Sequence, residues 1–339
     1  MSIQKRKKDH VQLTLGEDVN YLKSTGFEQY DFIHNALPET NFNEVSTHTS
    51  LLGRTFSFPL FISSMTGGYS GGVRVNSEIA EFCERWNLPF GVGSQRVMLE
   101  EPDTVKSFSV VRERAPEAFI AANIGGAQCI GGISEKDLDL LISTIRADAL
   151  IIHLNPLQEL MQPEGDRNFC GIEEGISDLV ESCSLPIIVK ETGAGISKET
   201  AHRLLKCGVK GIDVAGAGGT SWSRIENLRK SPVSEDSFFN DWGIPTSESI
   251  LQVASLRSDF SFNLIGSGGI RTTADMVKAI ALGANFTATA APIIRLLHEG
   301  GIDKLEKQFH LWEEEMRMIL TLLGCQSTDQ LRTYHLRKV

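Results

Sequence analysis

The chain has no long apolar segment: its apolar runs are about ten residues or shorter, and glycine or polar residues interrupt them. A transmembrane helix needs roughly 20 apolar residues, so the sequence excludes a membrane-spanning segment. The first ten residues, MSIQKRKKDH, are basic, and the segment after them carries acids where a signal peptide would have an apolar stretch. This pattern predicts a protein without a secretory signal peptide.

Basic residues are also in deficit, because 33 Lys and Arg oppose 43 Asp and Glu, which gives a net charge of −10. A sequence-independent nucleic-acid binder needs a basic face, so the balance argues against that class but not against a small anionic substrate. The six cysteines form no CxxC pair and indicate reduced core thiols, which predicts a cytoplasmic protein. Glycine and proline are near average, which excludes a collagen-like chain.

From residue 59 onward, short apolar runs alternate with amphipathic segments such as Lys198–Cys207 and Thr273–Leu282. Near-continuous apolar runs indicate strands buried on both faces of a parallel sheet. Eight β-α units in one domain predict an α/β fold of the TIM (β/α)8 barrel type. A doubly wound open sheet is the alternative, but no GxGxxG follows the first strand. The predicted strands are Pro59–Thr66, Pro89–Ser94, Ala118–Gly125, Ala149–Asn155, Pro186–Gly193, Gly211–Gly219, Asn263–Gly269 and Phe286–Pro292.

The units flanking the barrel follow from the same pattern. Residues 1–58 are predicted to form an N-terminal extension with a basic arm, residues 59–323 the barrel, and residues 324–339 a C-terminal tail. The last predicted helix, Ile302–Leu323, carries apolar residues at helical spacing, which indicates a surface packed on the barrel.

A phosphate site is predicted after strands seven and eight. GSGGIRT (Gly266–Thr272) follows strand seven, and ATAAP (Ala288–Pro292) ends strand eight. Glycines allow close approach of the backbone, and a helix that begins near Thr272 would offer free N–H groups and a positive dipole end. Loops after these two strands are the usual phosphate site of this fold. Flavin mononucleotide (FMN) and sugar phosphates are candidate ligands; a Gly-rich turn without a ligand is the alternative.

Lys190 lies near the end of strand five. A buried lysine there could form a Schiff base, lie beside an electron-rich ring, or simply pair with Glu191 or another acid. Its occurrence together with a phosphate site favours a flavin, because the anionic reduced flavin benefits from a nearby cation.

HLNPLQE (His153–Glu159) places an imidazole, two amides and a carboxylate after strand four. One carboxylate combined with substrate phosphates is a typical way to hold Mg²⁺, which makes Glu159 a candidate ligand. The alternatives are a glutamate in the first turn of a helix and, for His153, a core histidine bonded to the backbone.

The arm near the start carries four consecutive cations, Lys5 to Lys8. They either form a solvated arm or a lid that brings charge to a phosphate. Arg96, in GSQR after strand two, is a second candidate for binding an anion.

Eight motifs in this order resemble the type 2, FMN-dependent isopentenyl-diphosphate isomerases: RKKDH, SSMTGG, GSQR, NIGG, HLNPLQE, KETGAGIS, DVAGAGGTSW and GSGGIRT. The resemblance spans Arg6 to about Pro292. HLNPLQE and AGGTSW are more specific for this family than GSGGIR, which other flavin barrels share. The resemblance implies a role in isoprenoid biosynthesis, with FMN active in its reduced form, Mg²⁺, and NAD(P)H as reductant. It also implies a homo-oligomer, a tetramer or octamer.

The resemblance also implies roles for individual residues. FMN would be bound by Ser63, Ser64, Met65, Thr66, Ser94, Asn123, Lys190, Thr220, Gly268, Gly269, Arg271, Ala290 and Ala291. The diphosphate would be bound by Arg6, Lys7, Ser94, Gln95, Arg96 and Gln158, with Mg²⁺ on Glu159. The catalytic face would comprise His10, His153, Asn155, Gln158 and a supporting acid, Glu226.

The implied reaction moves a proton between isopentenyl and dimethylallyl diphosphate with no net redox change. An alkene is a very weak base, so a reduced flavin would supply the proton donor that the side chains lack. An oxidoreductase of the hydroxyacid oxidase or dihydroorotate dehydrogenase type is the alternative on the same barrel. Hydroxyacid oxidases need a His–Arg pair after strand seven, and no histidine is adjacent to Arg271. A phosphate-ligand binding protein without activity is a third hypothesis.

Overall fold

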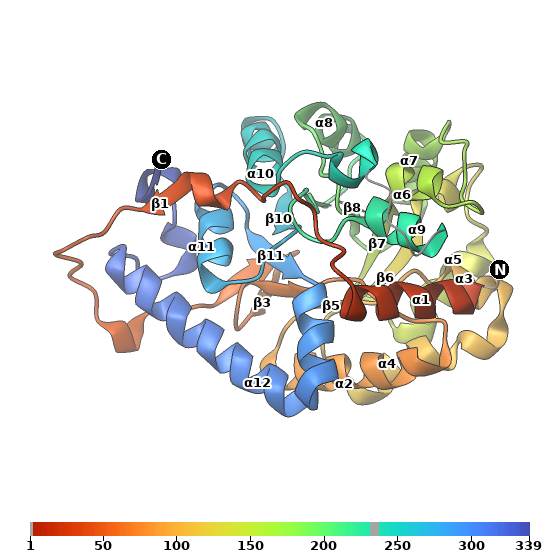
Figure 1. The fold of residues 1–339 in the computed structure, drawn as a ribbon, viewed down its shortest axis with the longest axis horizontal. Coiled ribbons are helices and arrows are strands. Elements are labelled where there is room, and N and C mark those ends of the chain that lie inside the picture. The colour runs from red at the N-terminus through yellow and green to blue at the C-terminus, as the bar shows by residue number, and fades with distance from the viewer. Residues whose placement is uncertain (1–2, 231–236) are drawn as a thin grey trace.

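A closed barrel of eight parallel strands forms the centre of the computed structural model, which describes residues 3–230 and 237–339 (Figure 1). The strands follow one another around the barrel in chain order, and the last pairs with the first, which confirms the predicted TIM barrel. They are β4 (Leu60–Ile62), β5 (Phe90–Gly91), β6 (Ile120–Gly125), β7 (Ala149–Leu154), β8 (Ile187–Glu191), β9 (Gly211–Asp213), β10 (Asn263–Ser267) and β11 (Phe286–Thr289).

Each strand lies inside its predicted range, and all but β6 end earlier than predicted. The predicted strand Gly211–Gly219 shows why, because β9 stops at Asp213 and the chain then turns out of the sheet. Ala215 has a φ of +36° and Gly218 a φ of +121°, values that do not occur in a strand. The remainder of this apolar run forms a loop at the carboxyl end of the barrel.

Helices between the strands cover the outside of the barrel. The predicted helices at residues 198–207 and 273–282 are confirmed to within one residue. No helix of residues 3–230 and 237–339 is long and apolar enough to cross a membrane. The helices are α1 (Ile3–Gly16), α2 (Ser70–Trp86), α3 (Arg96–Glu100), α4 (Lys106–Arg114), α5 (Glu135–Ile145), α6 (Pro156–Met161), α7 (Ile172–Ser182), α8 (Lys198–Lys206), α9 (Trp222–Lys230), α10 (Thr246–Ala254), α11 (Thr273–Ala281) and α12 (Ala291–Leu322).

Helix α12 consists of two segments, because Gly300 and Gly301 have non-helical φ and ψ angles. The second segment corresponds to the helix predicted from Ile302. Its buried stripe includes Leu305, Phe309 and Trp312, and the ring of Phe309 packs edge-on against Phe58 and Phe82. The stripe therefore packs on the barrel, as predicted.

The extension and the tail join at one end of the molecule. Strand β1 (Tyr30–Phe32) pairs antiparallel with β12 (Leu336–Lys338), and Figure 1 shows β1 beside the C-terminus. The hairpin of β2 (Thr49–Leu51) and β3 (Arg54–Phe56) contributes Leu51 and Phe56 to the apolar interior of the barrel. The ring of Phe56 contacts those of Phe119 and Phe286, which lie at the amino ends of β6 and β11. The hairpin thus closes the amino end, so a ligand site belongs at the other end.

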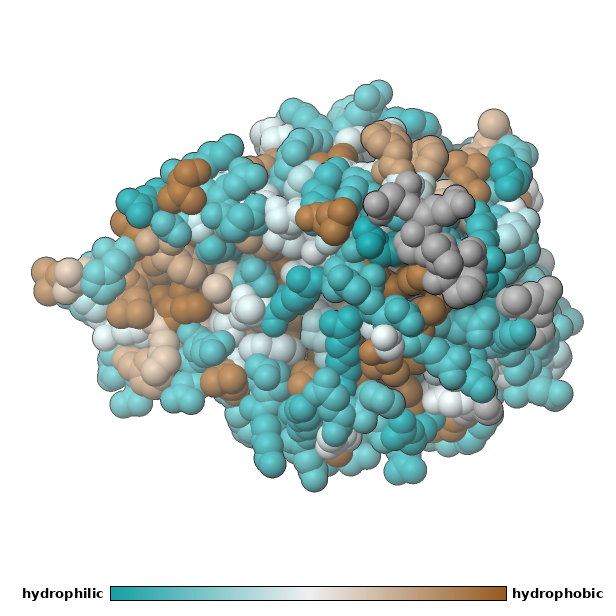
Figure 2. Space-filling model, in the orientation of Figure 1, coloured by the Kyte–Doolittle hydropathy of each residue, from teal (hydrophilic) through white to brown (hydrophobic). Residues whose placement is uncertain are grey.

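The visible surface is mainly hydrophilic, and apolar residues gather where the extension meets the end of α12 (Figure 2). Leu37 is 74% exposed there, and the backbone N–H of Asn35 donates to the carbonyl of Leu322 at 2.9 Å. This patch is remote from the carboxyl ends of the strands, where the polar side chains converge.

Candidate active site

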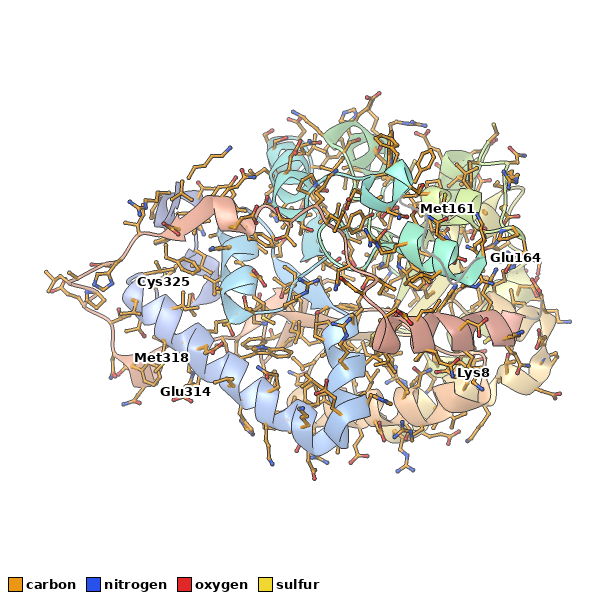
Figure 3. All side chains as sticks on the ribbon, viewed as in Figure 1. Lys8, Met161, Glu164, Glu314, Met318 and Cys325 are labelled. Atoms are coloured by element: carbon orange, nitrogen blue, oxygen red, sulfur yellow. The ribbon has the colours of Figure 1, made fainter. Side chains whose placement is uncertain are left out.

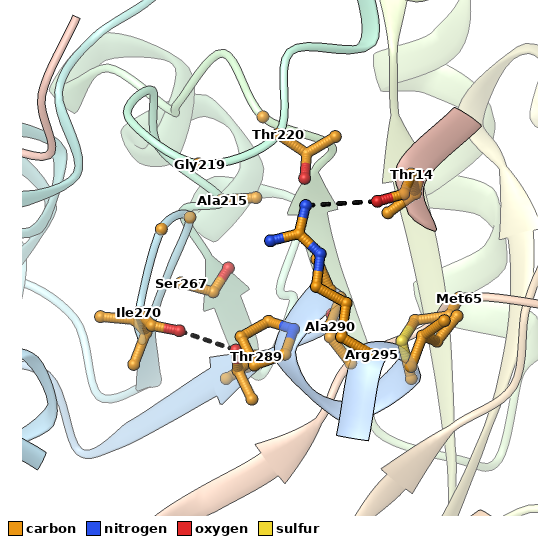
Figure 4. A pocket seen from close by; sticks show the side chains of 18 of the residues that line it. Thr14, Met65, Ala215, Gly219, Thr220, Ser267, Ile270, Thr289, Ala290 and Arg295 are labelled. Atoms are coloured by element: carbon orange, nitrogen blue, oxygen red, sulfur yellow. Dashed lines mark hydrogen bonds between the residues drawn. The ribbon is translucent and has the colours of Figure 1, made fainter. Parts of the chain in front are cut away.

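A cavity of about 460 Å³ lies at the carboxyl ends of the barrel strands (Figure 4). It is lined by the segments after β4, β8, β9, β10 and β11, and α1 contributes Lys7, His10 and Thr14 from above. Most residues predicted to bind the cofactor line this one cavity: Ser63, Ser64, Met65, Thr66, Lys190, Thr220, Gly268, Gly269, Arg271, Ala290 and Ala291.

Two glycine-rich loops form one wall of the cavity and pack against each other. A Cβ atom at Gly268 would lie 2.1 Å from the carbonyl oxygen of Gly216. At Gly269, which has a φ of +72°, it would lie 2.8 Å from the carbonyl oxygen of Gly218. The sequence suggested that these glycines admit a ligand, but their observed requirement is the close contact between loops.

The N-terminus of α11 offers fewer free N–H groups than expected near Thr272. The Asp275 carboxylate accepts from the backbone N–H of Arg271 at 3.0 Å and of Thr272 at 2.9 Å, and Thr272 Oγ1 caps Asp275 in return. This capping box occupies the N–H groups of Arg271, Thr272 and Asp275. Helix α12, in contrast, begins at the cavity without a side-chain cap, and Arg295 lies near its start. The uncapped α12 terminus is thus the better place for a phosphate.

Polar groups without hydrogen-bond partners also line the cavity, on the segment after β4. Ser64 Oγ and Thr66 Oγ1 are buried and form no hydrogen bond within the described part of the chain. Buried hydroxyls without partners are costly, so they indicate a ligand with polar edges. Lys190 is 7% exposed, and its Nζ donates to the Glu191 carbonyl at 2.6 Å. A polar ring system such as that of FMN fits these groups.

Helix α1 positions a second set of predicted residues across the cavity mouth. His10 Nε2 lies 2.9 Å from Glu226 Oε1, and Gln158 Nε2 donates to the same oxygen at 3.2 Å. The His10 ring packs edge-on against Trp222, with centroids 5.0 Å apart. Glu226 is fully buried. Burial raises its pKa, but His10 and Arg229 outweigh this, so the pKa of Glu226 lies below its usual value.

Asn155 and Glu159 extend this set along α6. The Asn155 amide donates to Gln158 Oε1 at 3.1 Å and to Glu159 Oε1 at 2.9 Å, and the N–H of Asp166 donates to Glu159 Oε2 at 2.8 Å. No group of three or more His, Cys, Asp or Glu side chains gathers as a metal site within the described residues. The Mg²⁺ site at Glu159 stays a prediction, and as a single carboxylate it would need substrate oxygens and water as further ligands.

His153 faces the barrel interior rather than this set. Its Nδ1 lies 2.7 Å from Asn123 Oδ1 on the neighbouring strand. Burial, together with the charges of Lys190 and Lys7, lowers the pKa of His153 to about 3. The imidazole is therefore neutral near pH 7 and is suited to donate or accept a hydrogen bond rather than to carry charge.

The predicted anion-binding residues are brought together only in part. Lys7 Nζ donates to the Ser94 carbonyl at 2.8 Å, and Arg6 donates to Gln162 Oε1 at 2.8 Å. Burial and the neighbouring Arg6 lower the pKa of Lys7 to about 7. Arg96 pairs with Glu100 at 2.8 Å and with Asp166 at 3.5 Å.

Gln95 lies away from the other anion-binding candidates. Its side chain is fully buried; Nε2 donates to the carbonyl of Leu141 at 3.0 Å, and Oε1 accepts from the N–H of Asn123 at 3.0 Å. These contacts are structural, because they join β6 to α5. A direct part for Gln95 in substrate binding stays a prediction.

Sequence reasoning missed residues that only the fold brings to the cavity. Arg295 Nη2 donates to the Thr14 carbonyl at 3.2 Å, which links α12 to α1 (Figure 4). Asn20 accepts from Arg271 Nη2 at 2.8 Å. A cation near a helix start opposes the helix dipole, so Arg295 carried a signal that could have been found. Asn20 carried none.

Comparisons with known proteins agree with this site. The family model of FMN-dependent dehydrogenases matches residues 155–338. Two relatives named isopentenyl-diphosphate delta-isomerase, from Chlorobium limicola and Chlorobium luteolum, are 42% and 43% identical, each over 98% of this chain and 95% of their own length. A third with that name, from Rickettsia africae, is 39% identical over 98% of this chain and 97% of its own.

Solved structures share the fold. A flavocytochrome b2 variant superposes with a TM-score of 0.70 at 18% identity, covering 97% of this chain and 82% of its own. A mandelate oxidase variant with benzaldehyde gives 0.68 at 17% identity, covering 99% and 97%. At this low identity these likenesses show the fold alone, whereas the curated relatives are about 40% identical over nearly the whole chain. The chain therefore belongs to the family of isopentenyl-diphosphate delta-isomerases and carries the FMN-dependent dehydrogenase domain in its C-terminal half.

Proposed function

We propose that this protein is an isomerase that interconverts isopentenyl and dimethylallyl diphosphate with reduced FMN and Mg²⁺. One observation carries the proposal: a single turn of α1 brings Lys7 and His10 to a cavity whose far side holds Lys190 and unpaired hydroxyls. An anion-binding group, a polar network and a ring-binding surface thus face one another. The family names of the relatives support the same conclusion.

The cofactor side of the cavity is preorganised by the chain. FMN, when bound and reduced, supplies a proton donor and an electron-rich ring that stabilises developing positive charge. Ser64 and Thr66 would accept or donate hydrogen bonds at the ring edge, and Lys190 would hold the ring's negative charge. The phosphate would lie at the uncapped start of α12, near Arg295.

The residues of α1, α6 and α9 would transfer the second proton and bind the diphosphate. Glu226 is an ionised carboxylate that accepts from His10 and Gln158, so this set can hold or move a proton at Glu226 Oε1. Lys7 and Arg6 would bind the diphosphate, and Arg96 would exchange its carboxylate partners for the substrate. Glu159 would hold Mg²⁺ against the same phosphates.

Replacing Glu159 by glutamine should raise the Mg²⁺ concentration needed for half-maximal turnover by about tenfold or more, because one charged contact is lost. FMN affinity should stay within about twofold of the original protein, since Glu159 does not line the cofactor cavity. Turnover titrated with MgCl₂ measures the first effect, and flavin fluorescence the second. The matched control is Glu181→Gln on the exposed face of α7. Unchanged Mg²⁺ dependence, or loss of FMN together with activity, would remove Glu159 as the ligand.

Further parts of the proposal rest on the family resemblance. They comprise NAD(P)H as the reductant, a homo-oligomer of tetramer or octamer type, and a cytoplasmic location. The division into residues 1–58, 59–323 and 324–339 also stays a proposal; the pairing of β1 with β12 supports treating the extension and tail as one layer.

The competing function is oxidation of a 2-hydroxyacid by the same barrel. Within the described residues that line the cavity, the histidine is His10, which comes from α1 rather than from the loop of Arg271. The test incubates the anaerobically reduced holoenzyme with isopentenyl diphosphate and Mg²⁺. We expect dimethylallyl diphosphate as product. Absence of that product, with flavin reduction by a panel of 2-hydroxyacids, would establish the oxidase function.

A further inference from the structure

Helix α9 carries a second charged residue one turn after Glu226. Arg229 pairs with Glu226 Oε2, and its other terminal nitrogen lies 2.8 Å from Glu164 Oε1 in the turn after α6. Its side chain is 6% exposed and that of Glu226 is fully buried. Figure 3 shows Glu164 beside α9, at the place where α6 and α9 meet.

The two carboxylate oxygens of Glu226 therefore have different hydrogen-bond partners. Oε2 contacts the guanidinium of Arg229, whereas Oε1 faces His10 and Gln158. A carboxylate bonded in this way cannot rotate without breaking a buried ion pair, and removing one partner of such a pair is strongly destabilising for the other. We propose that Arg229 is a positioning residue that keeps Glu226 ionised and directs its Oε1 at the reaction face. The assignment rests on the proposed isomerase function.

The charges around Glu226 are few enough to name. On the elements packed against α9 they are Lys5, Arg6, Lys7, Lys8, Asp9 and His10 of α1, Glu159 of α6, Glu164 of the following turn, and Asp241 of the 3-10 helix Phe238–Asp241. On α9 itself they are Arg224, Arg229 and Lys230. Of these groups, within the described residues, His10 and Arg229 contact the carboxylate directly. Arg229 lies on the same helix as Glu226, so α9 itself fixes the position of this cation relative to the carboxylate.

The consequence for the reaction is a defined protonation state. Burial favours the neutral acid, and an opposite charge in contact favours the carboxylate, typically by one to three pH units. With Arg229 in place, Glu226 enters turnover as an acceptor. Without it, Glu226 would keep its own proton up to a higher pH and could not accept another while protonated.

The test uses the FMN-loaded protein and Arg229→Met, with Arg229→Lys and the double variant Arg229→Met, Glu226→Gln. We expect Arg229→Met to move the acidic limb of the kcat profile upward by one to three pH units. It should lower kcat most strongly on the acidic side of pH 7, with KM within twofold, and activity should recover at higher pH. Arg229→Lys should restore most of the profile, and Arg229→Met should add less than twofold in the Glu226→Gln background. Arg224→Met on the same helix is the matched control and should leave the profile in place.

A second readout does not depend on turnover. A ¹³C-NMR titration of glutamate carboxyls, with Glu226→Gln to assign the signal, should show the Glu226 transition at higher pH in Arg229→Met. If the original protein proves not to be an isomerase, the proposed function fails while this titration still decides the role of Arg229. An unmoved Glu226 transition, or an equally large loss of kcat in the Glu226→Gln background, would overturn the assignment. If Arg229→Met does not fold, the pH profile and the NMR titration of Arg229→Lys decide. The proposal expects the Glu226 transition to stay near its original pH in Arg229→Lys, because the charge is kept. A Glu226 transition that moves in spite of the retained charge would overturn it.

Discussion

Replacing Lys190 by methionine should lower kcat of the reduced holoenzyme by about 10²–10³-fold, the range measured when one preorganised electrostatic contact is removed from an active site. Lys190 lies on β8 between His153 of β7 and Asp213 of β9, and it is the cation at the base of the cavity. Since a cation beside the ring favours the anionic reduced flavin, the reduction potential of bound FMN should also become more negative. Spectroelectrochemistry of the variant measures this shift.

The matched control for Lys190 is Lys278→Met. Lys278 also donates to a backbone carbonyl, that of Phe27 at 3.0 Å, but it does not line the cavity. This variant should keep both kcat and the potential. A potential that is unchanged in Lys190→Met would show that Lys190 does not act on the flavin, even if activity were lost.

Replacing Arg6 or Lys7 by alanine should lower kcat/KM for the diphosphate about ten- to hundredfold, because a charge-assisted contact to phosphate contributes about 1.5–3 kcal/mol. The first turn of α1 carries cations and no acid, where a helix ordinarily prefers acids. Such a turn concentrates positive potential at the cavity mouth and suits an anionic ligand. Steady-state kinetics with varied isopentenyl diphosphate provide the measurement.

Lys8→Ala is the control, because Lys8 lies on the same turn but is exposed. It should change kcat/KM less than twofold. Equal effects at all three positions would indicate a diffuse charge effect rather than contacts by Arg6 and Lys7, and no effect at any of them would return this segment to a solvated arm.

Lys7 also predicts a pH dependence. Its pKa of about 7 in the free protein means that the ammonium group is lost as the pH rises through neutrality. The protonated form binds the anion, so kcat/KM should fall above about pH 7. Lys7→Arg should flatten this limb, because a guanidinium stays charged there. A limb unchanged in Lys7→Arg would assign the titration to another group.

The barrel could be predicted because its signal is local. Each strand is an apolar, β-branched run that ends in small or polar residues, and this pattern survives without knowledge of the partners. Strand lengths could not be predicted as well: Val214 to Gly219 reads as a continuation of β9, yet positive φ values at Ala215 and Gly218 take it out of the sheet. Where an apolar loop follows an apolar strand, composition alone does not separate the two.

The site could be predicted where motifs are contiguous and not where contacts are long-range. SSMT and GSGGIR line one cavity because both lie at carboxyl ends of strands, and in a parallel barrel these ends meet at one end of the barrel. Gln95 shows the limit: it stands in such a motif between Ser94 and Arg96, but its side chain turns toward α5. The capping box of Thr272 and Asp275 likewise pairs backbone N–H groups that were predicted to be free for a phosphate. Arg229 reaches Glu164 across 65 positions, which no local pattern encodes.

The central claim is that reduced FMN acts in turnover without being consumed. The measurement is the number of product molecules formed per flavin after one anaerobic reduction, in D₂O, with no further reductant present. We predict many turnovers per flavin, no NAD(P)H oxidised per product, and solvent deuterium in the dimethylallyl diphosphate. One NAD(P)H consumed for each product, or equal turnover by the oxidised holoenzyme, would contradict the isomerase mechanism.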